Sequence, residues 1–86
     1  MAKPAATKPP TALTRRQRDI LLSIVEFMAE HHHAPSLREI QDASGLSSVS
    51  VVAHHLDVVE ARGYLRRTPG IPRSIVLLPP AYRVSR

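Results

Sequence analysis

Hydroxyl and imidazole side chains gather between residues 47 and 54, in a stretch that is otherwise rich in valine. Serine hydroxyls donate or accept hydrogen bonds, an imidazole can donate to guanine or phosphate, and an exposed valine can pack on a thymine methyl group. On a helix with about 100° per residue, Val52, Leu56 and Val59 share the buried side, which turns the polar side chains outward. An ordinary capped helix with a polar face has the same pattern, and an outward valine could equally pack against a neighbouring element. We predict contacts to base edges from Ser48, Ser50, Val51 and His54.

The charge distribution favours a polyanion as partner. The chain has 12 Lys and Arg against 7 Asp and Glu, for a formal net charge of +5. Residues 1–18 and 61–86 contain basic residues and no acid, whereas residues 19–60 hold all seven acids and a single arginine. Nucleic acid is the commonest polyanion for a small basic domain, although a solvated surface with basic tails is the simpler alternative. We predict phosphate contacts from Arg15, Arg16, Arg38, Ser47, Arg66, Arg67 and Arg73.

Other kinds of chemistry are not indicated. Adjacent histidines at residues 31–33 point about 100° apart near a helix end and cannot share one metal ion. Without cysteine, and without carboxylates at ligand spacing, we expect no metal and no cofactor. No Ser/His/Asp or paired-carboxylate grouping stands out, so we expect neither an enzyme nor a small-molecule site. Aromatic residues make up only 3%, which argues against a surface that stacks single-stranded bases.

Three helices are predicted to position these side chains. Thr14 with Gln17 and Ser36 with Glu39 both have the spacing of a capping box, which predicts helix starts at these points. The first helix carries a long apolar stripe and should end near residues 31–33. The second is short and ends at Gly45, which can supply a left-handed residue. Ser47 or Ser48 caps the third helix, which should run to about Arg62.

Two strands follow the helices, at residues 64–67 and 74–78, joined by a turn that contains Pro69, Gly70 and Pro72. Arg66 and Arg67 alternate faces on the first strand, so we expect only one of them to face DNA. One helix, then two helices joined by a tight glycine turn, and then a hairpin are typical of a winged helix-turn-helix, mainly α with a β-hairpin. We expect a flexible basic, Pro-rich arm (residues 1–12), the winged helix-turn-helix domain (13–78) and a short tail (79–86).

Several stretches together resemble the N-terminal DNA-binding domain of the LexA repressor family, over residues 13–78. They are Leu13-Thr14-Arg15-Arg16-Gln17, Ala34-Pro35-Ser36-Leu37-Arg38-Glu39-Ile40, Gly45-Leu46-Ser47-Ser48, His55-Leu56 and Arg62-Gly63-Tyr64-Leu65-Arg66-Arg67. The resemblance is closest in style to the Gram-positive and actinobacterial versions. It implies a DNA-binding transcriptional repressor of the SOS response that acts by steric block at GAAC/GTTC-type half-sites, with base contacts at the serine, valine and histidine positions predicted above.

The resemblance also raises the question of how the domain binds tightly. Full-length members of the family carry a self-cleaving, dimerising domain, which we do not expect in these 86 residues. Double-stranded DNA is the expected partner, bound by a homodimer or by a cooperative pair. A winged-helix module that binds a repressor or polymerase instead of DNA is the alternative. Apolar runs are short and no secretory signal stands at the N-terminus, so we expect a bacterial cytoplasmic protein with no membrane span.

Overall fold

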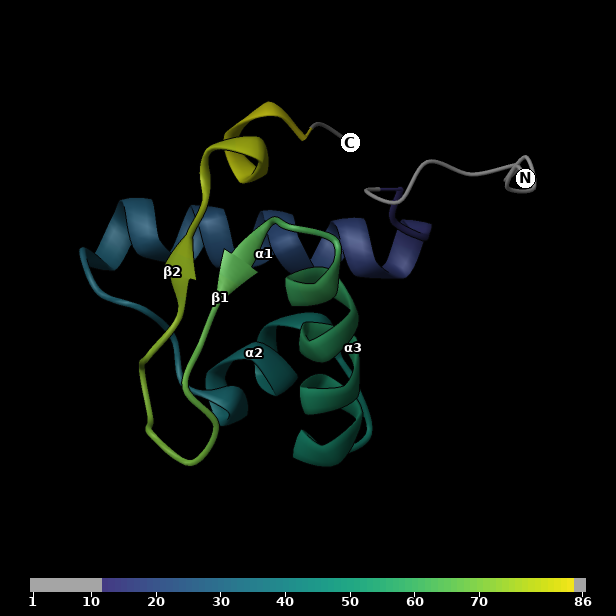
Figure 1. The fold of residues 1–86 in the computed structure, drawn as a ribbon. Helices are drawn as coiled ribbons and strands as arrows, with labels where there is room; N and C mark the ends of the chain where they lie inside the picture. Colours follow the sequence, from purple (N-terminus) through teal and green to yellow (C-terminus); the bar gives the residue numbers. More distant parts are fainter. Residues whose placement is uncertain (1–11, 85–86) are drawn as a thin grey trace.

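A computed structural model of the chain describes residues 12–84 (Figure 1). Its elements are α1 (Arg15–His31), α2 (Leu37–Ser44), α3 (Val49–Ala61), β1 (Leu65–Arg66), β2 (Val76–Leu77) and the 3-10 helix η1 (Pro79–Arg83). The three helices and the two-stranded antiparallel sheet confirm the predicted winged helix-turn-helix. Residues 1–11 of the expected arm lie outside the described residues, so that prediction is not tested.

Both predicted capping boxes form. The Gln17 amide donates to Thr14 Oγ1 at 3.2 Å and the Thr14 amide donates to Gln17 Oε1 at 3.1 Å, which satisfies two amides at the start of α1. Ser36 and Glu39 repeat the arrangement at the start of α2, at 3.1 and 2.8 Å. Helix α1 ends at His31, because the next residue, His32, adopts a left-handed conformation with φ of 62°.

The turn between α2 and α3 uses the residues that the sequence predicted for it. Gly45 follows α2 with φ of 71°, a conformation that glycine adopts at little cost, and its amide donates to the Gln41 carbonyl. Ser48 caps α3, and its Oγ accepts a hydrogen bond from the Val51 amide at 3.2 Å. The short turn fixes the direction in which α3 leaves α2.

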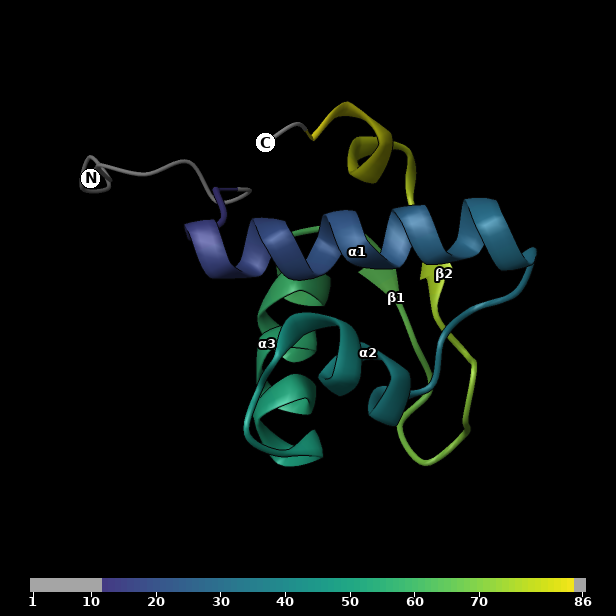
Figure 2. The same ribbon diagram turned by 180° about the vertical axis from the view of Figure 1, so that it is seen from behind.

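The hydrophobic core lies where the three helices meet the hairpin. Its fully buried side chains come from α1, α2, α3 and β1, and seen from behind, α1 crosses the top of the helix-turn-helix pair (Figure 2). The largest are Ile20, Leu21, Ile24, Ile40, Val52, Leu56, Val59 and Leu65. Burial of each such side chain stabilises the fold by about 1.5–3 kcal/mol before conformational entropy is subtracted. This core supports α3 from Val52 to Val59.

The hairpin is shorter than predicted. Among residues 12–84, only Leu65 with Leu77 and Arg66 with Val76 pair as strand partners. Beyond them the Ser74 hydroxyl bridges to the amide and carbonyl of Thr68 at 2.9 and 3.0 Å, which replaces a backbone ladder by a side chain. Residues 68–71 then turn back, with Pro69 and Gly70 in the central positions. We call the connection formed by residues 68–72 the wing loop.

The segment after the hairpin folds back onto α1. Ala81 of η1 is 1% exposed and belongs to the hydrophobic core, and Val84 packs against that core. The sequence predicted only a short tail after residue 78, so the packing of η1 is an addition to the predicted domain. The 3-10 helix η1 thus covers the side of α1 that faces away from α2 and α3 (Figure 1).

Candidate nucleic-acid interface

The start of α3, the start of α2 and the wing loop lie at one end of the molecule. In Figures 1 and 2 this end is at the bottom, while α1 and η1 lie at the top. We call it the lower end, formed by residues 37–38, 47–51 and 68–72. Such an arrangement presents a projecting helix and a hairpin loop at the same end, which suits a helix in the major groove and a loop on the neighbouring backbone.

Helix α3 divides into a buried and an exposed side as predicted. Val52, Leu56 and Val59 are each 0% exposed. Ser50 and His54 are exposed on the opposite side. Their hydroxyl and imidazole groups therefore remain available to an outside partner.

Two further predicted base contacts are less exposed. Ser48 is half-buried and its Oγ already accepts the Val51 amide, so its hydroxyl proton is the group left for an outside acceptor. Val51 is half-buried in the first turn of α3. Val49, the first residue of α3, is 37% exposed. The first turn of α3 thus adds an apolar side chain to the lower end.

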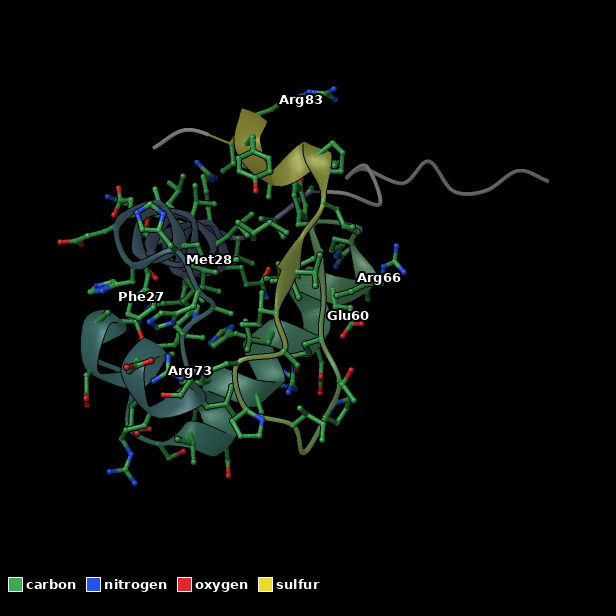
Figure 3. The ribbon with its side chains drawn as sticks, turned by 90° about the vertical axis from the view of Figure 1, so that its left-hand side faces the viewer. Phe27, Met28, Glu60, Arg66, Arg73 and Arg83 are labelled. Atoms are coloured by element: carbon green, nitrogen blue, oxygen red, sulfur yellow. The ribbon has the colours of Figure 1, made fainter. Side chains whose placement is uncertain are left out.

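The predicted phosphate contacts separate into different places. Ser47 and Arg38 are exposed at the lower end, in the turn before α3 and in the first turn of α2. Arg15 and Arg16 are exposed in the first turn of α1, away from the lower end. Arg66 is exposed in β1, at the base of the hairpin near Glu60 (Figure 3).

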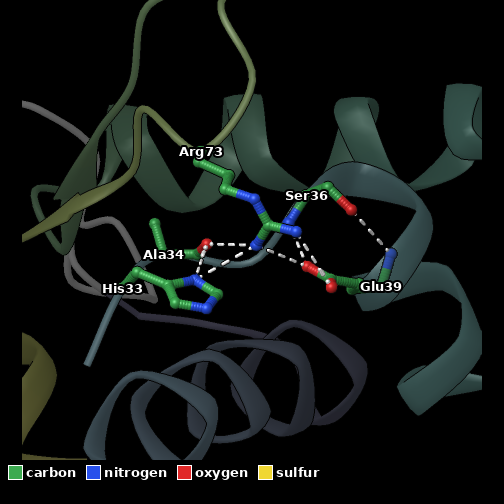
Figure 4. Close-up of polar contacts among 5 residues, drawn as sticks. All are labelled: His33, Ala34, Ser36, Glu39 and Arg73. Atoms are coloured by element: carbon green, nitrogen blue, oxygen red, sulfur yellow. Dashed lines mark hydrogen bonds and ion pairs between the residues drawn. The ribbon is translucent and has the colours of Figure 1, made fainter. Parts of the chain in front are cut away.

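Arg73 makes several contacts within the protein (Figure 4). Its Nη1 and Nη2 donate to the two carboxylate oxygens of Glu39 at 2.9 and 3.1 Å. Nη1 also donates to the Ala34 carbonyl at 3.0 Å and lies 3.1 Å from His33 Nδ1. A guanidinium held in this way by a carboxylate is a strong, directional pair. The predicted phosphate contact of Arg73 stays a prediction, and the Arg73 guanidinium is already paired with Glu39.

Arg67 is also paired. Its Nη2 donates to Asp57 Oδ1 of α3 at 3.0 Å, and its side chain is only 10% exposed. Arg66, the last residue of β1, is exposed and points outward (Figure 3), whereas Arg67 follows the strand and is largely buried. No local signal in the sequence indicates these partners, because Glu39 and Asp57 are 34 and 10 residues away from their arginines.

The hydrogen bonds of Glu39 and the burial of His55 lower the pKa values of these two side chains. The hydrogen bond from Arg73, followed by that from the Ser36 amide, lowers the pKa of Glu39 from 4.5 to about 2. Burial lowers the pKa of His55, and the nearby charges of His54 and Arg16 lower it further. Glu39 therefore stays charged under ordinary conditions, while His55 is held toward its neutral form.

Within residues 12–84 no group of three or more His, Cys, Asp or Glu side chains is placed to hold a metal ion. In the same part of the chain no helix is long and apolar enough to cross a membrane.

Comparisons with known proteins agree on one family. A family model for the LexA DNA binding domain matches residues 10–74. The LexA repressor of Mycobacterium ulcerans (strain Agy99) is 52% identical over 65 residues, which cover 76% of this chain and 27% of the relative. The LexA repressor of Mycobacterium tuberculosis (strain ATCC 25177 / H37Ra) is 51% identical over 65 residues, covering 76% and 28%. The chain thus spans little more than a quarter of the length of these relatives.

Proposed function

The chain belongs to the LexA DNA-binding domain family, and from this premise we propose that it is a DNA-binding transcriptional repressor and not an enzyme. The observation that carries the proposal is the position of Ser50 and His54. Both are exposed on α3 while the apolar seam of the same helix is fully buried. The helix is therefore supported from behind and presents donors and acceptors in front, as a major-groove reader must.

The proposed contacts follow from this geometry. The start of α3 enters the major groove and reads base edges with Ser48, Ser50, Val51 and His54. Ser47 and Arg38 meet the phosphates that border the groove, where the N-terminal end of α2 also attracts negative charge. Arg15, Arg16 and Arg66 would reach phosphates farther from the lower end, and they add long-range attraction in any case.

Binding of the protein to its operator is sufficient for repression. A protein bound at an operator blocks polymerase sterically, and this requires no chemistry from the protein. The resemblance noted above favours operators with GAAC/GTTC-type half-sites. A protein of this kind works on the bacterial nucleoid, so we place it in the cytoplasm.

A single domain of this size covers a small site. One such module buries roughly 600–1,000 Å² against DNA, which gives weak binding to a lone half-site. Two copies on adjacent half-sites gain from effective concentration if they touch each other or share a distorted duplex. We therefore propose binding as a homodimer or as a cooperative pair.

A gel shift tests the proposal. The protein is titrated against a duplex with two GAAC/GTTC-type half-sites and against a scrambled duplex, at low and moderate salt. We expect preference for the first duplex, with log K falling by about 0.9 per phosphate contact for each unit of log salt. Four contacts would give a slope of about −3.6. Failure to retain either duplex at low salt would overturn the proposal.

A protein-interaction module is the second candidate, and one observation favours it. Two of the predicted phosphate-binding arginines, Arg67 and Arg73, are paired with acids, which reduces the free positive charge near the lower end. A repressor or polymerase would then be the partner. The same gel shift discriminates, because a module of this kind retains no duplex at low salt.

A further inference from the structure

The wing loop carries no charged side chain, but an arginine stands on each side of it. Residues 68–72 are Thr, Pro, Gly, Ile and Pro. Arg67 precedes them and Arg73 follows them. Each arginine reaches a different helix of the helix-turn-helix pair, and both do so through a carboxylate.

The Arg73 contact fixes the returning side of the loop to α2. The guanidinium binds both oxygens of Glu39, and Glu39 Oε1 also accepts the Ser36 amide in the capping box. The backbone of Arg73 has φ of 57°, in the left-handed region that a non-glycine residue rarely adopts. Such a conformation costs free energy and persists where the surrounding contacts hold it in place.

The Arg67 contact fixes the outgoing side of the loop to α3. The side chain passes through the interior edge of the hairpin, 10% exposed, and emerges at Asp57, which is 67% exposed. Arg67 also lines a mostly apolar hollow of about 270 Å³ together with Pro35, Leu37 and Ile75. The charged end therefore meets Asp57 only when the hairpin lies against both helices.

The hairpin is anchored in the hydrophobic core by Leu65 and Ile75, which lie outside the wing loop. Its strands are two residues long, and an isolated two-stranded hairpin is at best marginally stable in water. The Ser74 bridge to Thr68 closes the neck of the loop by hydrogen bonds within the hairpin connection. In the described structure, the two arginine–carboxylate pairs are the polar links that tie the flanks of the loop to α2 and α3.

We propose that Arg67 and Arg73 are positioning residues that hold the uncharged wing loop at a fixed place beside α3, so that loop and helix meet one duplex together. The inference rests on the proposed function and assigns these two arginines a role other than phosphate binding. It also assigns Glu39 and Asp57 a role in DNA binding, although both are negatively charged.

Glu39 and Asp57 are negatively charged, so the inference can be tested by whether DNA binding strengthens or weakens when each charge is removed. Removing an acid near a polyanion ordinarily strengthens binding, because repulsion is lost. If Arg67 and Arg73 bound phosphate directly, freeing them from their carboxylates would strengthen binding further. If they position the loop, the same change weakens binding.

The experiment compares Glu39→Gln and Asp57→Asn with Asp42→Asn, which neutralises an exposed acid of α2 outside both pairs. Glutamine preserves the capping box, since α1 of this chain uses Gln17 at the same position. We expect Glu39→Gln and Asp57→Asn each to weaken binding of the two-half-site duplex roughly twofold to fivefold, with an unchanged salt slope. Asp42→Asn should bind as tightly as the parent chain or more tightly. Equal or tighter binding by Glu39→Gln and Asp57→Asn would overturn the inference.

A second measurement on the free protein separates this inference from the proposed function. Amide hydrogen exchange at Thr68 and Ile71 reports the order of the loop, because both amides are hydrogen-bonded within it. We expect faster exchange at these amides in Glu39→Gln and Asp57→Asn and no change in Asp42→Asn. Unchanged exchange in the first two variants contradicts the positioning role, whether or not DNA binds. If the parent chain retains no duplex while exchange changes as expected, the proposed function is wrong, but the two arginine–carboxylate pairs still hold the loop in place.

Discussion

Ser50 and Val52 lie two residues apart on α3, yet Ser50 faces solvent and Val52 is completely buried. The alternation follows from helix geometry, since positions two apart point about 200° away from each other. One helix thus serves the core and the lower end of the molecule at once. A substitution on the exposed side should alter binding without altering the fold, and the predictions below use that separation.

Ser50→Ala and His54→Ala should weaken binding to the preferred duplex. Loss of one hydrogen bond costs about 1 kcal/mol, or roughly fivefold in affinity. The scrambled duplex should bind each variant as it binds the parent chain, because contacts to base edges carry sequence preference and phosphate contacts do not. Anisotropy titrations with both duplexes measure this. Equal weakening for both duplexes would show that these side chains do not read bases.

Ser48→Ala should also destabilise the fold. Its Oγ accepts the Val51 amide at the start of α3, and loss of such a cap costs about 1 kcal/mol in free energy of unfolding. Ser47→Ala is the matched control, since Ser47 is exposed and does not cap the helix. Its effect should stay within about 0.5 kcal/mol. Urea unfolding of the two variants compares them, and equal stabilities would contradict the capping role.

His55 should make stability depend on pH near neutrality. Its pKa in the folded state is lowered from 6.5 by burial, so the unfolded chain binds the proton more readily. Stability from this group is therefore complete above pH 6.5 and decreases as the pH falls from 6.5 toward the lowered value. Urea unfolding between pH 8 and pH 5 measures the decrease.

His55→Gln should remove part of that pH dependence, whereas His54→Gln should retain most of it, because burial of His55, the largest cause of its lowered pKa, is left in place. A pH profile that is the same in His55→Gln and in the parent chain would show that burial of this imidazole does not control stability.

Glu39 should make the stability of the fold depend on pH in a second, more acidic range. Its pKa is lowered from 4.5 to about 2, so its stabilising effect is complete above pH 4.5 and disappears as the pH falls toward 2. The midpoint of thermal unfolding should fall over this range in the parent chain and in Asp42→Asn. Glu39→Gln has no carboxyl group to titrate at this position and should show a shallower fall. Parallel curves for all three proteins would contradict a pairing of Glu39 with Arg73 in solution.

The helices and their contacts with the core were predictable because their signals are local. Capping boxes at Thr14 and Ser36 need only four consecutive residues, and a buried seam such as Val52 and Leu56 repeats within one turn. Gly45 marks the turn between the helices for an equally local reason, its positive φ. These signals also predicted which side of α3 is exposed, and hence the candidate base contacts.

The partners of the arginines were not predictable because they are set by tertiary structure. Arg73 meets Glu39 only after the hairpin folds back onto α2, and neither residue differs in type from an ordinary solvated charge. The length of the strands also escaped prediction, because the Ser74 side chain takes the place of the ladder beyond Val76. The same is true of η1, where small Ala81 fits against α1 without any periodic pattern.

Chemical-shift mapping of the amides during titration with the two-half-site duplex tests most directly whether the exposed side of α3 meets DNA. The largest changes should fall in residues 47–54 and in the wing loop, with small changes along α1 and η1. Changes centred on α1 and η1, with residues 47–54 unaffected, would contradict the proposed interface.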